Sequence, residues 1–217
     1  SPLPGTRAEA YSIRQLFPNA LVLAGPRATK VAVEQVRAPS ILHIATHGFF
    51  LEDTSAGNAA GGGLGDEAST ANPLLRSGLA FSGANLHPPA GEMGILIALE
   101  ASTLNLWGTK LVTLSACDTG LGEVKNGEGV YGLRRAFFLA GAESVVMSLW
   151  PVSDYATRGM MTAYYRGLRS GVGRADGLRA VQLATMHYKG REHPYFWASF
   201  ILAGERASLA GAVDRLR

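Results

Sequence analysis

The chain has 217 residues, 47% of them apolar and 17% charged, which is enough to bury a sizeable core as one domain. Its formal net charge is +3, but lysines and arginines are scattered without a polybasic run, so we expect no nucleic-acid or anionic-membrane partner. One cysteine excludes an internal disulfide framework and a thiolate-rich zinc site, and no apolar stretch approaches the ~20 residues that span a bilayer. We therefore predict a cytoplasmic protein.

Strand-like and helical patterns alternate along the chain. In chain order we predict a helix at 5–17, a strand at 20–25, a helix at 28–37, a strand at 41–46, a strand at 77–83, a helix at 94–106, a strand at 111–116, a helix at 127–142, a strand at 144–150, helices at 155–171 and 174–189, and a strand at 197–204. This alternation favours a mainly parallel sheet with helices on both faces. Residues 51–72 lose the periodicity and are rich in glycine and alanine. We predict a mobile surface loop there, within a single domain of residues 1–217.

Two apolar runs are each followed by a reactive side chain. His47 and Gly48 follow ILHIAT, and Cys117 follows LVTLSA. The carboxyl ends of parallel strands meet at one edge of a sheet, where the active sites of open α/β folds form. A thiol and an imidazole brought together there make a nucleophile and its base. The backbone N–H groups of Gly48 and Cys117 are candidate donors to a developing oxyanion.

Other interpretations of these residues remain open from the sequence. Cys117 could be a packing residue, since free cysteine is among the most buried residue types. His43 and His47 are four residues apart, but on a strand this separation is ~13 Å, too far for one metal ion. We therefore predict no metal site and interpret His43 as a core residue.

Five segments of the sequence, in order, resemble one known family. They are HIATHGFF, PLLRSGLAFSG, LVTLSACDTGLGE, GEGVYGLRRAFFLAGAESVVMSLWPVSD and HPYFWASFILAG. Together they resemble the CHAT domain, a caspase-like cysteine peptidase group related to separase and often joined to tetratricopeptide repeats. The resemblance extends from about residue 3 to residue 204, which is nearly the whole chain.

The resemblance implies a fold and a catalytic pair. The fold would be α/β, a caspase-like three-layer sandwich with a mostly parallel central sheet of about six strands. The catalytic histidine precedes the glycine of the ATHG motif, which is His47 here, and the nucleophile is Cys117. The oxyanion donors would be the N–H groups of Gly48 and Cys117. The chemistry of such a peptidase needs no metal or organic cofactor.

The resemblance also suggests a substrate preference. LWPVSD is similar to the LWDVTD-type stretch of separases, whose final acidic residue lines the pocket for an arginine at the P1 position. This makes Asp154 a candidate for the S1 pocket, with Asp118 beside the nucleophile as a second candidate. Asp154 also directly precedes a helical pattern, so it could equally be the N-cap of that helix.

The chain departs from the family pattern at its start. CHAT domains usually have further strands and a helix before the segment that corresponds to LPGTRAEA, which here begins at residue 3. We therefore expect the chain to be the C-terminal part of a longer polypeptide, with the N-terminal part of the family domain missing or present as another chain.

By family analogy the function would be a bacterial cysteine endopeptidase in regulated proteolysis, antiphage defence or cell death. Its protein substrate would be a gasdermin-like pore-forming protein or another effector. The competing class is a non-catalytic caspase-fold scaffold for a repeat-protein or effector partner. A third interpretation, a thiol hydrolase of small amides, has no support from a dedicated pocket motif in the sequence.

Overall fold

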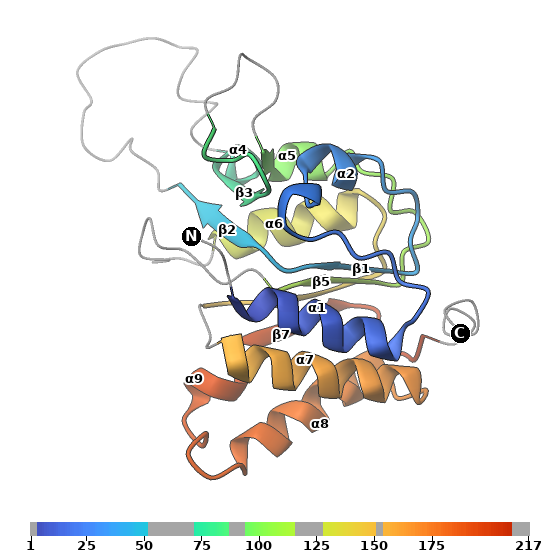
Figure 1. Cartoon of the computed structure of the whole chain (residues 1–217), viewed down its shortest axis with the longest axis vertical. Helices are drawn as coiled ribbons and strands as arrows, with labels where there is room; N and C mark the ends of the chain where they lie inside the picture. Colours follow the sequence, from blue (N-terminus) through green and yellow to red (C-terminus); the bar gives the residue numbers. More distant parts are fainter. Residues whose placement is uncertain (1–3, 52–71, 87–93, 116–127, 151–153, 210–217) are drawn as a thin grey trace, which may run out of the picture.

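The computed structural model describes residues 4–51, 72–86, 94–115, 128–150 and 154–209. Its centre is a four-stranded sheet in the order β1-β5-β6-β7 (Figure 1). The strands are β1 (Ile41–Ile44), β5 (Leu111–Leu114), β6 (Ser144–Ser148) and β7 (Phe200–Gly204). The first three run parallel, and β7 pairs antiparallel with β6. Every residue of β5 and β6 is buried, as expected for apolar strands that are covered on both faces.

One face of this sheet is covered by α1 (Pro4–Leu16), α7 (Asp154–Arg169) and α8 (Arg174–Met186). Here α1 lies beside α7, and α8 lies beyond them (Figure 1). The side chains of this core come from every one of these elements; among them are Phe17, Leu111, Val146, Met161, Tyr165, Leu178 and Phe200. The amphipathic spacing of α1 and α7, together with Leu178 and Val181 of α8, thus gives the sheet its first hydrophobic core.

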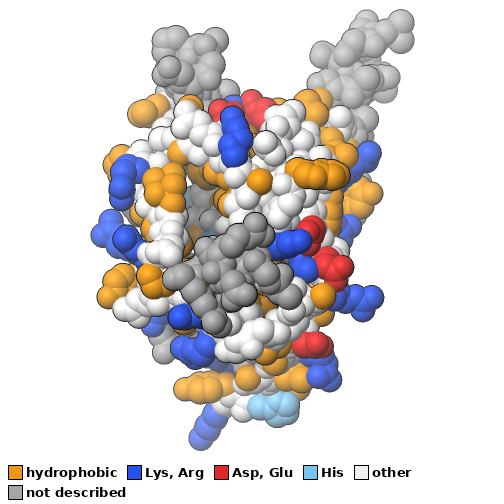
Figure 2. Space-filling view, turned by 90° about the vertical axis from the view of Figure 1, so that its right-hand side faces the viewer, with side chains coloured by type: hydrophobic (Ala, Val, Ile, Leu, Met, Phe, Trp, Pro, Cys, Tyr) orange, Lys and Arg blue, Asp and Glu red, His pale blue; other side chains and the backbone are white. Residues whose placement is uncertain are grey.

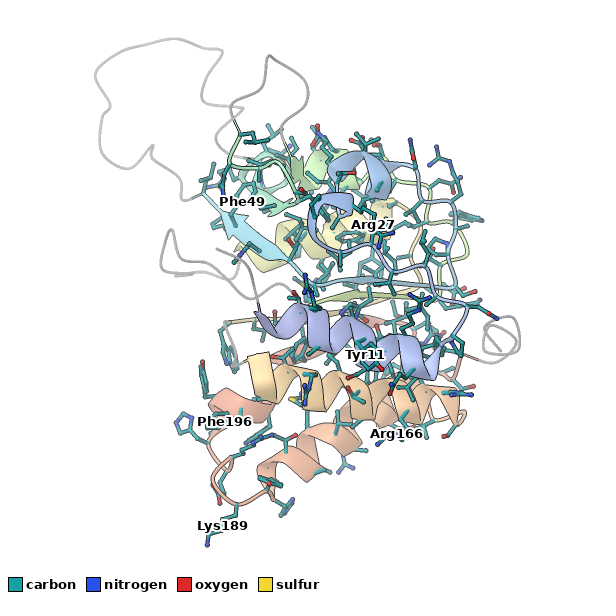
Figure 3. All side chains as sticks on the ribbon, in the orientation of Figure 1. Tyr11, Arg27, Phe49, Arg166, Lys189 and Phe196 are labelled. Carbon is teal, nitrogen blue, oxygen red and sulfur yellow. The ribbon has the colours of Figure 1, made fainter. Side chains whose placement is uncertain are left out.

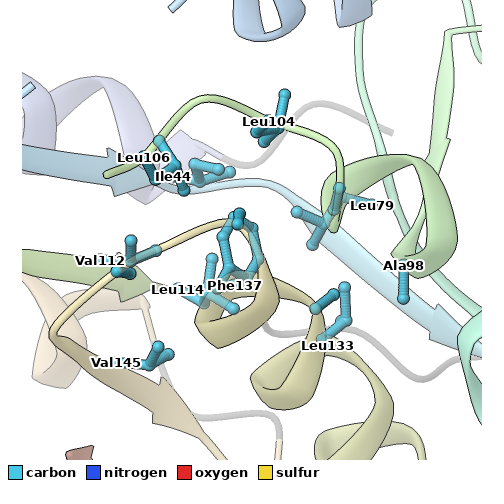
Figure 4. Packing of buried hydrophobic residues seen from close by; sticks show 14 of the residues in the cluster. Ile44, Leu79, Ala98, Leu104, Leu106, Val112, Leu114, Leu133, Phe137 and Val145 are labelled. Atoms are coloured by element: carbon cyan, nitrogen blue, oxygen red, sulfur yellow. The ribbon is translucent and has the colours of Figure 1, made fainter. Parts of the chain in front are cut away.

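The opposite face carries the second core, which is built around α6 (Glu128–Leu139). Phe137 lies at its centre, between the strands and the rest of α6 (Figure 4). The core continues onto two short elements, α2 (Lys30–Glu34) and α5 (Ala98–Ala101), and onto a second sheet. The layers are therefore helix, sheet and helix, with the second sheet beside α6.

The second sheet is antiparallel, in the order β2-β3-β4. Its strands are β2 (His47–Phe50), β3 (Ser77–Ala80) and β4 (Ile95–Ile97). At Gly78 on β3, an added Cβ atom would lie 2.6 Å from the Phe49 ring and 2.7 Å from the carbonyl oxygen of Leu96. Figure 3 shows the Phe49 side chain on β2. Glycine at position 78 therefore lets the three strands pack closely and sets the position of β2.

Part of the expected fold is confirmed and part is corrected. The mixed α/β class, the helices on both faces and the mostly parallel central sheet are present. The prediction of one sheet of about six strands is wrong for the described residues. They form a sheet of four strands and a separate antiparallel sheet of three. The reason is that the chain after β1 turns away and pairs with β3, rather than extending the central sheet.

Two predicted elements take a different form. The predicted strand 20–25 is not a strand: Leu21 is 84% exposed, and no described strand pairs with this segment, so its backbone has no ladder to join. The predicted helix 94–106 is instead β4 followed by α5, because Ile95 and Ile97 pair with β3. Glu100 then accepts a hydrogen bond from the Ile97 N–H at 3.0 Å and caps the start of α5.

Two short helices that begin at prolines were not predicted from the sequence. They are α4 (Pro73–Arg76) and α9 (Pro194–Trp197). The loop predicted at 51–72 lies outside the described residues except for its two ends. Within the described ranges, no helix combines the length and the apolarity needed to cross a bilayer. Basic side chains occupy separated places on the face shown in Figure 2, in keeping with their scatter along the sequence.

The close packing at Gly78 gives a stability prediction. We expect Gly78→Ala to lower the free energy of unfolding by about 1–3 kcal/mol, because the added methyl group meets a backbone carbonyl. The matched control is Gly159→Ala in α7, where an added Cβ atom has open space, and it should raise stability by about 0.5–1 kcal/mol. Urea unfolding followed by circular dichroism measures both. Equal effects of the two substitutions would contradict the packing at Gly78.

Two buried tyrosines predict the alkaline limit of stability. Burial raises the pKa of both Tyr164 and Tyr165 above the ordinary value of 10.0. The folded state favours the protonated phenols. Their contribution to the free energy of unfolding is therefore complete below about pH 10 and is lost as the pH rises further. Phenolate absorbance from two tyrosines should therefore appear only together with the loss of the circular dichroism signal. Full titration of all tyrosines in a chain that keeps its native spectrum would contradict this burial.

Candidate active site

His47 lies at the junction of the two sheets. The predicted strand 41–46 ends two residues early, at Ile44, and His47 is the first residue of β2. It is partly exposed and is paired with Ala80 of β3, while Gly48 is paired with Leu79. The Thr46 hydroxyl donates to the Ala80 carbonyl and closes the turn between β1 and β2. The pairing with β3 thus fixes the direction in which the backbone leaves the central sheet at His47.

The chain toward Cys117 leaves the same edge from the neighbouring strand. β1 and β5 are parallel, with Ile44 beside Leu114, and the Ser115 N–H donates to the Ile44 carbonyl at 2.9 Å. His47 follows Ile44 by three residues, and Cys117 follows Leu114 by three. Cys117 itself lies outside the described residues. The described geometry therefore brings together the two strand ends that the sequence analysis singled out.

A buried polar cluster lies at these strand ends, on the face covered by α1 and α7. Glu9 of α1 is 3% exposed; its Oε1 lies 3.3 Å from His43 Nε2, and its Oε2 lies 3.4 Å from the Ser115 hydroxyl, which donates to it. His43 Nδ1 lies 2.9 Å from the phenol oxygen of Tyr165, and that phenol donates to Thr113 Oγ1 at 2.8 Å. One carboxyl group from α1 thus contacts both β1 and the residue that directly follows β5.

His43 was predicted from the sequence to be a core residue, whereas Glu9 was not singled out. The His43 side chain is 14% exposed and contacts Glu9 and Tyr165, so it lies in a partly buried polar cluster and belongs to neither apolar core. Glu9 precedes Ile13 by four residues and Leu16 by seven, so it shares the buried face of the helix. A carboxylate at that spacing was the signal that could have identified it.

The two candidates for the S1 pocket remain predictions. Asp118 lies outside the described residues. Asp154 is the first residue of α7, but its side chain is not described, so neither the pocket interpretation nor the N-cap interpretation is tested. Among the described side chains, no group of three or more histidine, cysteine, aspartate and glutamate residues is arranged to hold a metal ion.

Comparison with known proteins identifies the family. The model of the CHAT domain matches residues 1–205. Tetratricopeptide repeat protein 28 of Homo sapiens and that of Mus musculus are each 30% identical to this chain over 96% of its length. The chain spans only 9% of the length of either relative. Because the family model covers nearly all of the sequence, this chain belongs to the CHAT domain family.

Proposed function

We propose that this CHAT domain is a cysteine endopeptidase that uses Cys117 as nucleophile and His47 as general base and acid. The observation that supports the proposal most is the parallel register of β1 and β5, with Ile44 beside Leu114. Because these adjacent parallel strands end at the same edge of the sheet, the two reactive side chains that follow them are brought to that edge. A nucleophile and its base need to be this close to exchange a proton. The CHAT family, with its caspase-like peptidase members, supports the same assignment.

The proposed reaction has two halves. His47 accepts the thiol proton of Cys117, and the sulfur attacks the carbonyl carbon of the scissile peptide bond. The backbone N–H groups of Gly48 and Cys117 donate to the oxyanion of the tetrahedral intermediate. The imidazolium then protonates the leaving amine, which leaves a thioester on Cys117. Water, deprotonated by His47, hydrolyses the thioester and restores the thiol.

The substrate in this proposal is a protein cut after arginine or lysine. An acidic side chain at Asp154, or alternatively at Asp118, would pair with the basic side chain at the P1 position. By family analogy the domain would act in the bacterial cytoplasm on a gasdermin-like or other effector protein, in regulated proteolysis or defence. That placement rests on the family alone.

A second candidate function is a non-catalytic interaction module. The specific observation in its favour is that the matched relatives are named as tetratricopeptide repeat proteins. A caspase-like fold held beside such repeats would serve as a scaffold for a partner and would need no turnover. The two functions differ in one measurable property, which is hydrolysis that depends on Cys117.

We expect wild type to cleave members of a tiled peptide library and Cys117→Ala to cleave none. His47→Ala should lower kcat by about 10²- to 10⁴-fold, the usual contribution of a general base. His187→Gln is the matched control, because His187 is the C-cap residue of α8, and it should retain wild-type activity. Cleavage products are identified by mass spectrometry. Equal cleavage by wild type and Cys117→Ala would contradict the peptidase proposal.

The preference at P1 is tested with peptides that differ only in arginine, lysine, aspartate or leucine at that position. Wild type should prefer arginine or lysine. Asp154→Asn should lower kcat/KM for the arginine peptide by about 10- to 100-fold, the equivalent of one charge-assisted hydrogen bond. If Asp118→Asn has this effect and Asp154→Asn does not, the pocket is assigned to Asp118. A preference for aspartate or leucine in wild type would contradict an acidic S1 pocket.

A further inference from the structure

Four buried polar side chains and the partly buried His43 have no role in the proposed reaction. They are here called the strand-end cluster: Glu9, His43, Thr113, Ser115 and Tyr165. They come from four elements, α1, β1, β5 and α7, and meet at the carboxyl ends of β1 and β5. Buried polar groups are costly unless each finds a partner. The positions of the protons therefore decide which groups of the cluster are paired.

The protons can be placed from one end of the cluster. In the direction that the structure assigns, Tyr165 donates its proton to Thr113 at 2.8 Å, and its oxygen then accepts from His43 Nδ1 at 2.9 Å. Burial raises the pKa of Tyr165, so the phenol keeps the proton that it donates. His43 Nδ1 must then carry a proton, which fixes that side of the imidazole ring.

The other side of the ring then faces Glu9. A neutral imidazole that is protonated at Nδ1 presents a lone pair at Nε2, and Glu9 Oε1 lies 3.3 Å from that nitrogen. Two acceptors at this distance repel each other, and Glu9 has little water around it, since it is only 3% exposed. One proton between Oε1 and Nε2 turns the repulsion into a hydrogen bond and leaves the pair with no net charge.

We propose that Glu9 and His43 share one proton and act as positioning residues, which hold the carboxyl ends of β1 and β5 in place for His47. Glu9 reaches His43 on β1 through Oε1 and Ser115, the residue directly after β5, through Oε2. His43 precedes His47 by four residues. The consequence for catalysis rests on the proposed peptidase function, whereas the shared proton and its effect on His47 do not.

The shared proton is tested in wild type by nuclear magnetic resonance of ¹⁵N-histidine-labelled protein at neutral pH. We expect hydrogen-bonded proton resonances at both ring nitrogens of His43, assigned by their loss in His43→Gln. Tyr165→Phe should shift the Nδ1 resonance, and Glu9→Gln should remove or shift the Nε2 resonance. An Nε2 without any hydrogen-bonded proton in wild type would overturn the proposal.

The positioning role is tested with two matched pairs of variants. Glu100→Gln is the control for Glu9→Gln, because Glu100 pairs with Lys30 at 2.6 Å on the opposite face of the sheet. Tyr164→Phe is the control for Tyr165→Phe: both phenols are fully buried, but the Tyr164 hydroxyl has no hydrogen-bond partner among the described residues. Tyr165→Phe keeps the ring, so it tests the proposal even if Glu9→Gln does not fold.

The cluster variants should shift the imidazole resonances of His47, and the controls should leave them in place. With a cleavable peptide, Tyr165→Phe should lower kcat about tenfold, the equivalent of one buried hydrogen bond, with little change in KM. Unshifted His47 resonances in Tyr165→Phe would overturn the positioning role. If wild type shows the shared proton and the His47 shifts but cleaves no peptide, the positioning proposal stands and the peptidase proposal fails.

Discussion

The parallel pairing of β1 with β5 is the constraint on which the site depends. Ile44 and Leu114 face the core around α6, whereas His43 and Thr113 face α1 and α7. Because side chains alternate along a strand, a slip of one residue would place His43 in the apolar core and an isoleucine against Glu9. The same slip would change the length of chain between the sheet and His47. Register and site are thus fixed by one set of contacts.

Apolar packing surrounds the polar contacts and holds them in place. The Tyr165 ring makes edge or tilted contacts with Phe17 and Tyr164, at centroid distances of 5.9 and 5.8 Å. These rings shield the strand-end cluster from solvent, which strengthens its hydrogen bonds and raises the cost of leaving one unmade. A buried polar group without a partner is costly, so the contacts of Glu9 with His43 and Ser115 favour the observed position of α1 on the sheet. We infer that the cluster selects the docked position of α1 as well as the strand register.

Much of this arrangement could be predicted from the sequence, for identifiable reasons. Strands β5 and β6 are continuous apolar runs, and α7 and α8 have clear helical periodicity, so their types were predicted correctly. His47 and Gly48 were singled out because they follow such a strand. The second sheet was missed because its strands are only three or four residues long and their pairing is set by tertiary contacts. Glu9 was missed because a lone carboxylate on an amphipathic helix is usually a solvated residue.

The most direct test of the account is whether Cys117 and His47 act on each other. A peptide that ends in arginine and carries a thiol-reactive group should modify Cys117 in wild type, as seen by intact mass. We expect His47→Ala to slow this modification by at least about tenfold, because the thiol loses its base. Iodoacetamide should modify the denatured forms of both proteins at one rate. Equal modification of folded wild type and His47→Ala would contradict the convergence of the two strand ends on one site.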